Sequence, residues 1–175
     1  GNHDHYCSHS ISLNDFHPLA ANVVDWTRSQ LGKADGDFLR DLKHVRVVHG
    51  FTLVHGTLDM PEKWGYVFDE LEAESNFNYQ STTVCFNGHT HQPAVFEKGS
   101  VVRRCDASVI KIVFGKKYFF NVGSVGQPRD GDTRASYVIY DTEAREVIYR
   151  RIEYDYQITQ KKIIAAGLPE RLAQR

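Results

Sequence analysis

Cysteine is scarce in the chain and its pattern excludes a disulfide framework. Among 175 residues there are only Cys7, Cys85 and Cys105. Their number is odd and they lie far apart, whereas small secreted domains carry closely spaced, even-numbered cysteines. We therefore expect reduced thiols and a cytoplasmic protein.

The chain also lacks an excess of charge of either sign and any long apolar run. It has 21 basic and 22 acidic residues, a formal net charge of -1, which provides no general attraction to nucleic acid or to an anionic membrane. No apolar run approaches the ~20 residues of a membrane span, and no secretory signal opens the chain. We therefore expect neither a nucleic-acid nor a membrane partner. The length, with 41% hydrophobic and 25% charged residues, is typical of one globular domain over residues 1–175.

Histidine, in contrast, is plentiful, and two of the nine histidines stand in the run Asn-Gly-His-Thr-His at residues 87–91. This run follows an apolar segment, 84–86, that is typical of a buried strand. In an extended segment the side chains of His89 and His91 would point the same way. Because neutral imidazole is the commonest metal ligand, the pattern predicts a metal site at the end of this strand.

Three further motifs occur in order with this one. The chain opens Gly-Asn-His-Asp at residues 1–4, a predicted strand at 51–54 ends in His55-Gly56, and a glycine-containing run occupies residues 121–129. Together with Gly-His-Thr-His, this order of motifs resembles the calcineurin-like metallophosphoesterase superfamily, in particular its bacterial diadenosine-tetraphosphatase-like or protein-phosphatase-like branch. The resemblance extends to about residue 170.

The chain departs from the family in lacking its first two motifs, Asp-x-His and Gly-Asp-x-x-Asp, which should lie upstream. Asp15-Phe16-His17 spells the first motif but precedes a predicted helix, so Asn14 or Asp15 is better explained as its N-cap, with Pro18 in the first turn. The run 36–41 nearly spells the second motif, with its second carboxylate one residue late. We therefore expect a metallophosphoesterase domain that is truncated at its N-terminus.

The resemblance implies two divalent transition-metal ions, Mn, Fe, Zn or Co, and assigns ligands to them. Asn2, His55 and His89 would bind the second ion, and His91 would bind the first. Nitrogen and oxygen ligands suit these metals better than calcium.

The resemblance also implies a general acid and a phosphate contact. His3 would protonate the leaving group, with Asp4 holding its imidazole; the alternative is a helix cap or a surface turn. Ser124, between two glycines, and Arg129 would bind the substrate phosphate. The alternative for Ser124 and Arg129 is an ordinary turn with a solvated arginine.

Patterning predicts mixed secondary structure. Residues 1–4 are expected in a loop, and helices at 19–31, 37–42, 64–74 and 158–166, with a short one possible at 169–174. We expect strands at 45–48, 51–54, 84–86, 94–96, 101–104, 109–114, 118–122, 137–140 and 147–154. The link His49-Gly50 is typical of a tight hairpin turn, so His49 is given no ligand role.

These expectations combine into an α/β sandwich of two mixed β-sheets flanked by helices, in four layers α/β/β/α, with N-terminal strands missing. The predicted function is hydrolysis of phosphomonoesters or phosphodiesters by a two-metal mechanism. A phosphoprotein, a dinucleoside polyphosphate and a cyclic nucleotide all remain open as substrates, and the oligomeric state is open too. The alternatives are a structural or regulatory metal site and a non-catalytic fragment of the same fold. Residues 1–175 alone are expected to be inactive.

Overall fold

The computed structural model describes residues 1–14 and 16–174. Its contacts group into two compact units, Gly1–Lys43 together with Asp155–Arg175, and His44–Tyr154. The assignment of a single domain to residues 1–175 stays a prediction. Asp15, one of the two proposed N-caps, lies outside the described residues.

The larger sheet of the second unit has six strands in the order β1-β2-β3-β7-β4-β5. Its strands are β1 (Val45–Val48), β2 (Phe51–Val54), β3 (Val84–Asn87), β4 (Ala94–Lys98), β5 (Val102–Cys105) and β7 (Lys117–Asn121). Strands β2, β3 and β7 are parallel neighbours, while the other pairings are antiparallel. This sheet is therefore mixed, as predicted.

The smaller sheet has three antiparallel strands in the order β6-β9-β8. They are β6 (Val109–Lys111), β8 (Ala135–Asp141) and β9 (Glu146–Ile152). All nine predicted strands are present, although β6 ends before the predicted residue 114. Two sheets are confirmed, but the smaller one is antiparallel rather than mixed.

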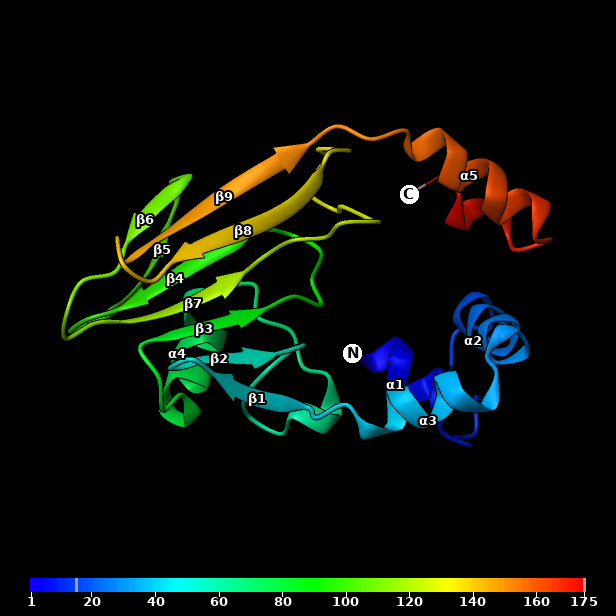
Figure 1. The fold of residues 1–175 in the computed structure, drawn as a ribbon, viewed down its shortest axis with the longest axis horizontal. Helices are drawn as coiled ribbons and strands as arrows, with labels where there is room; N and C mark the ends of the chain where they lie inside the picture. The colour runs from blue at the N-terminus through cyan, green and yellow to red at the C-terminus, as the bar shows by residue number, and fades with distance from the viewer. Residues whose placement is uncertain (15, 175) are drawn as a thin grey trace. The chain divides into compact units, whose positions relative to one another are not determined.

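Alternation along the central strands divides the core of the second unit into two layers. Successive residues in a strand point to opposite faces, and here Cys85 and Phe119 join one buried cluster while Phe86 and Phe120 join the other. The cluster with Cys85 and Phe119 packs beneath helix α4 (Glu70–Tyr79) and includes Ala73 and Phe77 of that helix. The cluster with Phe86 and Phe120 lies between the two sheets. Figure 1 shows α4 on the face of the larger sheet opposite the smaller one.

The hairpin β1-β2 forms as the sequence predicts. His49 and Gly50 both have positive φ, 46° and 84°, as the favoured two-residue hairpin turn requires. His49 therefore lies at one end of β2 and His55 follows the other end, so the structure agrees that His49 belongs to the turn.

The helix predicted at 64–74 is misplaced. The short 3₁₀ helix η1 spans Pro61–Lys63, and α4 begins only at Glu70, with the Asp69 side chain accepting a hydrogen bond from the Glu72 amide. Trp64 and Val67 are buried, but Phe68 and Leu71 are exposed. Trp64 and Val67 thus enter the core, three positions apart, from a segment without regular secondary structure.

The first unit contains α1 (Asn2–Ser8), α2 (Pro18–Gln30), α3 (Lys33–Asp41), α5 (Tyr156–Ala165) and the 3₁₀ helix η2 (Glu170–Leu172). The loop predicted for residues 1–4 is wrong, because Asn2 begins a helix. Pro18 occupies the first turn of α2 as predicted, but the N-cap is His17, whose Nδ1 accepts from the Leu19 amide. No helix within the described residues is long and apolar enough to cross a membrane.

Candidate metal centre

The ends of three parallel strands bring the candidate residues of the second unit together. Strand β3 pairs with β2 on one side and with β7 on the other, with Asn87 opposite Asn121. Beyond the strands, the Gly88 amide donates to the His55 carbonyl at 2.9 Å, and the Val122 amide donates to the Asn87 carbonyl at 2.9 Å. Because the carboxyl ends of parallel strands share one sheet edge, where sites of α/β folds collect, the residues that follow each strand lie side by side.

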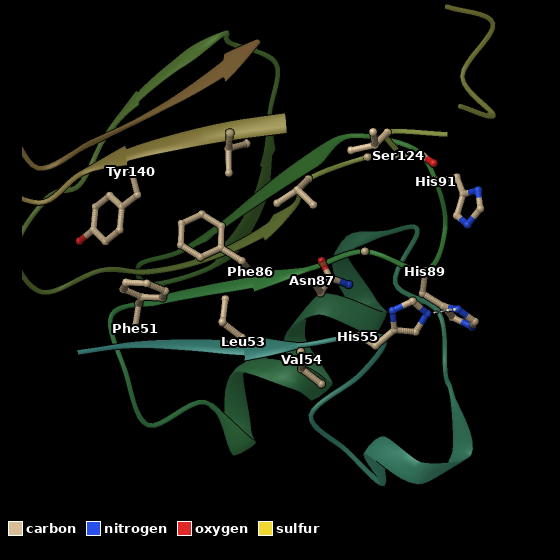
Figure 2. Close-up of a pocket in the computed structure, with 15 residues that line it drawn as sticks. Phe51, Leu53, Val54, His55, Phe86, Asn87, His89, His91, Ser124 and Tyr140 are labelled. Atoms are coloured by element: carbon tan, nitrogen blue, oxygen red, sulfur yellow. Dashed lines mark hydrogen bonds between the residues drawn. The ribbon is translucent and has the colours of Figure 1, made fainter. Parts of the chain in front are cut away.

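His55 and His89 face each other across this edge. His55 Nε2 lies 3.1 Å from His89 Nδ1, and Figure 2 shows the two rings adjacent, joined by this contact. Two imidazole nitrogens that bind one transition-metal ion at about 2.0–2.1 Å stand roughly 2.9–3.4 Å apart. The donor set and its spacing therefore fit a shared metal ion.

His91 is oriented separately, by the backbone. Its Nδ1 lies 2.7 Å from the carbonyl oxygen of Gln127. Because a carbonyl can only accept, Nδ1 carries the proton and Nε2 keeps its lone pair, which is how second partners commonly prepare a histidine ligand. Figure 2 shows His91 on the Ser124 side of the pocket, away from the His55–His89 pair.

The backbone of the motif is not extended, so the predicted reason for the placement of its histidines is wrong. His89 and His91 have φ of 68° and 61°, in the left-handed region that non-glycine residues rarely adopt. Such backbone is costly and tends to persist at functional sites. It sends the two imidazoles to different sides of the site rather than to one point.

Asn121 holds this strained loop in place. The Asn121 side chain is buried; its Nδ2 donates to the Gly88 carbonyl at 2.6 Å and to Thr90 Oγ1 at 2.9 Å, while its Oδ1 accepts from the Gly123 amide at 3.0 Å. From the sequence, Asn121 was expected only to begin a phosphate-binding run. Its position at the end of an apolar run, like that of Asn87, is the sequence signal that could have identified it.

A pocket of about 700 Å³ adjoins the histidines. Its lining combines polar side chains, among them His55, Asn87, His89, His91 and Ser124, with apolar ones, among them Phe51, Leu53, Phe86, Val122, Val138 and Tyr140. Figure 2 shows Phe51, Phe86 and Tyr140 on the side of the pocket away from His89 and His91. Asn87 is almost fully buried: its Nδ2 donates to the Gly56 carbonyl at 3.1 Å, and its Oδ1 has no hydrogen-bond partner among the described residues. Asn87 is therefore a buried amide beside the pocket whose oxygen is unsatisfied within the described residues, and sequence reasoning gave it no role.

The motif at residues 1–4 lies in the other unit. Asn2, His3 and Asp4 occupy the first turn of α1, where Asp4 Oδ2 accepts from the Gly1 nitrogen at 2.6 Å. Their predicted roles, Asn2 as a ligand with His55 and His89, and His3 with Asp4 as the acid, stay predictions.

The predicted phosphate contacts are seated in a turn that also supports His91. Ser124 Oγ accepts from the Gln127 amide at 2.9 Å, and the Arg129 amide donates to the His91 carbonyl at 3.1 Å. Arg129 Nη2 donates to Gln127 Oε1 at 3.0 Å. The run thus braces the histidine loop, and its binding of a phosphate stays a prediction.

No group of three or more His, Cys, Asp or Glu side chains that could hold a metal ion is found within residues 1–14 and 16–174. The His55–His89 pair is therefore a two-ligand arrangement within the second unit.

Asp37 lies in the run that nearly spells the second family motif. Its carboxyl contacts Lys33 Nζ and the Arg40 guanidinium on α3, and these hydrogen bonds lower the pKa of the carboxyl.

Two sheets with histidines after the ends of parallel strands are features by which a class of protein can be recognised. Comparison of the sequence with models of known families identifies that class. The model of the calcineurin-like phosphoesterase superfamily domain matches residues 1–145, so the chain belongs to this family.

Individual relatives agree. An uncharacterised protein of Methanocaldococcus jannaschii is 34% identical over 180 residues, which cover the whole of this chain and 72% of that protein. A crystal structure titled as a metallophosphoesterase from Sphaerobacter thermophilus is 36% identical, with a TM-score of 0.86, covering 100% of this chain and 73% of that one. A hypothetical protein from Pyrococcus horikoshii, 18% identical with a TM-score of 0.71 over 98% of this chain and 68% of its own, shares the fold.

Proposed function

We propose that the protein hydrolyses phosphomonoesters or phosphodiesters by a two-metal mechanism. The observation that carries the proposal is the 3.1 Å approach of His55 Nε2 to His89 Nδ1 at the ends of two parallel strands. It is supported by the orientation of His91, whose Nδ1 faces the Gln127 carbonyl. Membership of the calcineurin-like family, whose members generally use divalent metal ions, agrees with it.

Different residues of the chain would serve the two metal ions. His55 and His89, with Asn2, would hold one ion, and His91 would belong to the other. When bound, two divalent ions supply the positive charge that polarises the phosphoryl oxygens and activates water at neutral pH. Imidazole and amide donors suit Mn, Fe, Zn or Co, and neutral ligands leave the charge of the ions available to the phosphate.

The remaining roles concern the proton and the phosphate. In the proposed mechanism, His3 gives a proton to the leaving oxygen, which would otherwise depart as an alkoxide, and Asp4 would hold the orientation of that imidazole. Arg129 offers a planar fork to the phosphate oxygens. Ser124, whose flanking glycines bring backbone amides close to an anion, would bind the phosphate together with Arg129.

The proposed substrate is a small phosphoester or a phosphoprotein, without a nucleic-acid or membrane partner. The proposed compartment is the cytoplasm, because Cys7, Cys85 and Cys105 are free thiols, as is usual in reducing surroundings.

The direct test is hydrolysis by the complete gene product. It would be purified, loaded with Mn²⁺ and assayed with p-nitrophenyl phosphate and bis(p-nitrophenyl) phosphate. We expect turnover of at least one ester and its loss on treatment with a chelator. Bound metal without turnover of either ester would instead favour the non-catalytic alternative.

A further inference from the structure

Two exposed aromatic rings continue outward from the candidate metal centre. Tyr66 stacks on His89, with ring centroids 4.2 Å apart and planes inclined by 18°, and Phe68 stacks on Tyr66 at 5.5 Å and 12°. The three rings form a row of near-parallel planes that begins at a proposed metal ligand. We call His89, Tyr66 and Phe68 the aromatic row.

Core packing does not account for the outer members of the row. Tyr66 and Phe68 are 46% and 47% exposed, while Val67 between them is 2% exposed and belongs to the core cluster beneath α4. Full burial of a phenylalanine side chain stabilises a folded protein, because it removes a large apolar surface from water. Exposure of two adjacent rings forgoes that stabilisation, and exposed apolar patches commonly mark binding sites.

The segment that carries the row is held firmly at its inner side. Trp64 is buried and lies edge-on to His55, with ring centroids 6.0 Å apart and planes at 75°. A Cβ placed on Gly65 would meet the Thr57 side chain at 2.9 Å, and one on Gly56 would meet the Gly65 carbonyl at 2.5 Å. These close approaches fix Tyr66 and Phe68 beside the histidine pair, so the row is preorganised.

From these contacts we infer that the aromatic row is a specificity subsite for a phosphoester that carries a planar aromatic group, such as a nucleobase, which stacks on Phe68 while the phosphate reaches the histidines. The inference rests on the proposed function and narrows its substrate class. Parallel rings with an exposed outer member suit a flat π-system, whereas a sugar or an aliphatic phosphate has no face to stack. Base–aromatic stacking contributes about 1–3 kcal/mol per base, which corresponds to roughly 5- to 150-fold in kcat/KM.

The test compares two substrates that differ only in the base. Adenosine 5′-monophosphate and ribose 5-phosphate have the same primary-alcohol leaving group, so the ratio of their kcat/KM values isolates the contribution of the base. With the Mn²⁺-loaded complete gene product, we expect a ratio of about 10 or more, which Phe68→Leu lowers by about 10-fold. Phe114→Leu is the matched control, because Phe114 is 90% exposed in the turn between β6 and β7, and it should leave the ratio unchanged.

A second measurement tests the subsite if the enzyme hydrolyses diesters in preference to monoesters. Adenosine should inhibit the hydrolysis of bis(p-nitrophenyl) phosphate more strongly than ribose, and Phe68→Leu should weaken that inhibition. Hydrolysis with equal inhibition by adenosine and ribose, or an equal loss of kcat/KM for both monoesters in the variant, would overturn the subsite and leave the phosphoesterase intact. A metal-loaded protein that hydrolyses no ester would instead overturn the proposed function, and the subsite with it.

Discussion

The imidazole of His91 depends on its neighbours for orientation, and the same is true of the loop that carries it. The carbonyl of Gln127 fixes which nitrogen of His91 carries the proton, and Asn121 ties Gly88 and Thr90 to the end of β7. Gln127 and Asn121 can therefore affect metal binding without touching an ion. Such supporting partners commonly change metal affinity by 10- to 100-fold.

Asn121→Ala should therefore weaken metal binding while the protein remains folded. The expected loss is on the order of 10-fold in affinity for Mn²⁺, because the two hydrogen bonds from Asn121 to Gly88 and Thr90, which hold the left-handed backbone of His89 and His91, disappear. Titration of the metal-free protein by calorimetry measures it. Asn78→Ala, at an exposed position of α4, is the matched control, and equal affinities of the two variants would show that Asn121 serves stability alone.

His3→Asn tests the proposed general acid. The variant should lose kcat most on esters with poor leaving groups, by roughly 10²–10⁴-fold, and least on p-nitrophenyl phosphate, whose leaving group needs little protonation. Steady-state kinetics on an alkyl and an aryl ester of the complete gene product provide the comparison. Losses of the same size on both esters would count against the role of His3.

At the scale of elements, the fold was largely predictable because its strands follow simple rules. Short runs rich in β-branched or aromatic residues, separated by glycine, aspartate or lysine turns, predicted all nine strands, and His49-Gly50 identified the β1-β2 turn. The helix at 64–74 was misplaced because Trp64 and Val67 enter the core from an irregular segment at a spacing that imitates a helix. The better signal was Asp69 followed by Glu72, a capping pattern just before α4.

The site was predictable only in part, for a physical reason. His55, His89 and His91 could be chosen because each follows a strand. The left-handed backbone at His89 and His91 could not be predicted, because among residue types only glycine and asparagine indicate that conformation. The aromatic row was also hidden, since a helix over residues 64–74 would place Trp64, Val67 and Phe68 on one face. Sequence spacing could not separate the buried members from the exposed ones.

The loop from Gly56 to Gly65 gives a test at this scale. An alanine at Gly56 would place its Cβ 2.5 Å from the Gly65 carbonyl, so the loop must shift or the residue must strain. Gly56→Ala should lower the free energy of unfolding by about 1–3 kcal/mol, measured by urea denaturation. Gly99→Ala, where the nearest atom is 3.9 Å away, should stay within about 0.5 kcal/mol of the wild type; a Gly56 variant as stable as that control would show that the two glycines are not in contact.

At the scale of the whole molecule, metal binding depends on how many ligands meet. By family resemblance, the first ion takes its remaining ligands from Asp-x-His, and both ions share an aspartate from Gly-Asp-x-x-Asp; neither motif stands at the end of a strand in the described part of residues 1–175. Metal affinity grows with the number and preorganisation of ligands. We expect residues 1–175, expressed alone with Mn²⁺, to bind at most one ion weakly and to leave bis(p-nitrophenyl) phosphate intact. Turnover with two tightly bound ions would show that carboxylates elsewhere in the chain complete the site.

The most direct test of the central claim is the metal content of the complete gene product and of its histidine variants, determined by elemental analysis after purification. We predict two ions per chain in the wild type and about one in His55→Ala and in His89→Ala, because each variant removes one member of the 3.1 Å pair. His49→Asn, at the far end of β2 in a turn that suits asparagine, should keep both ions. Unchanged metal content in both His55→Ala and His89→Ala would contradict the account.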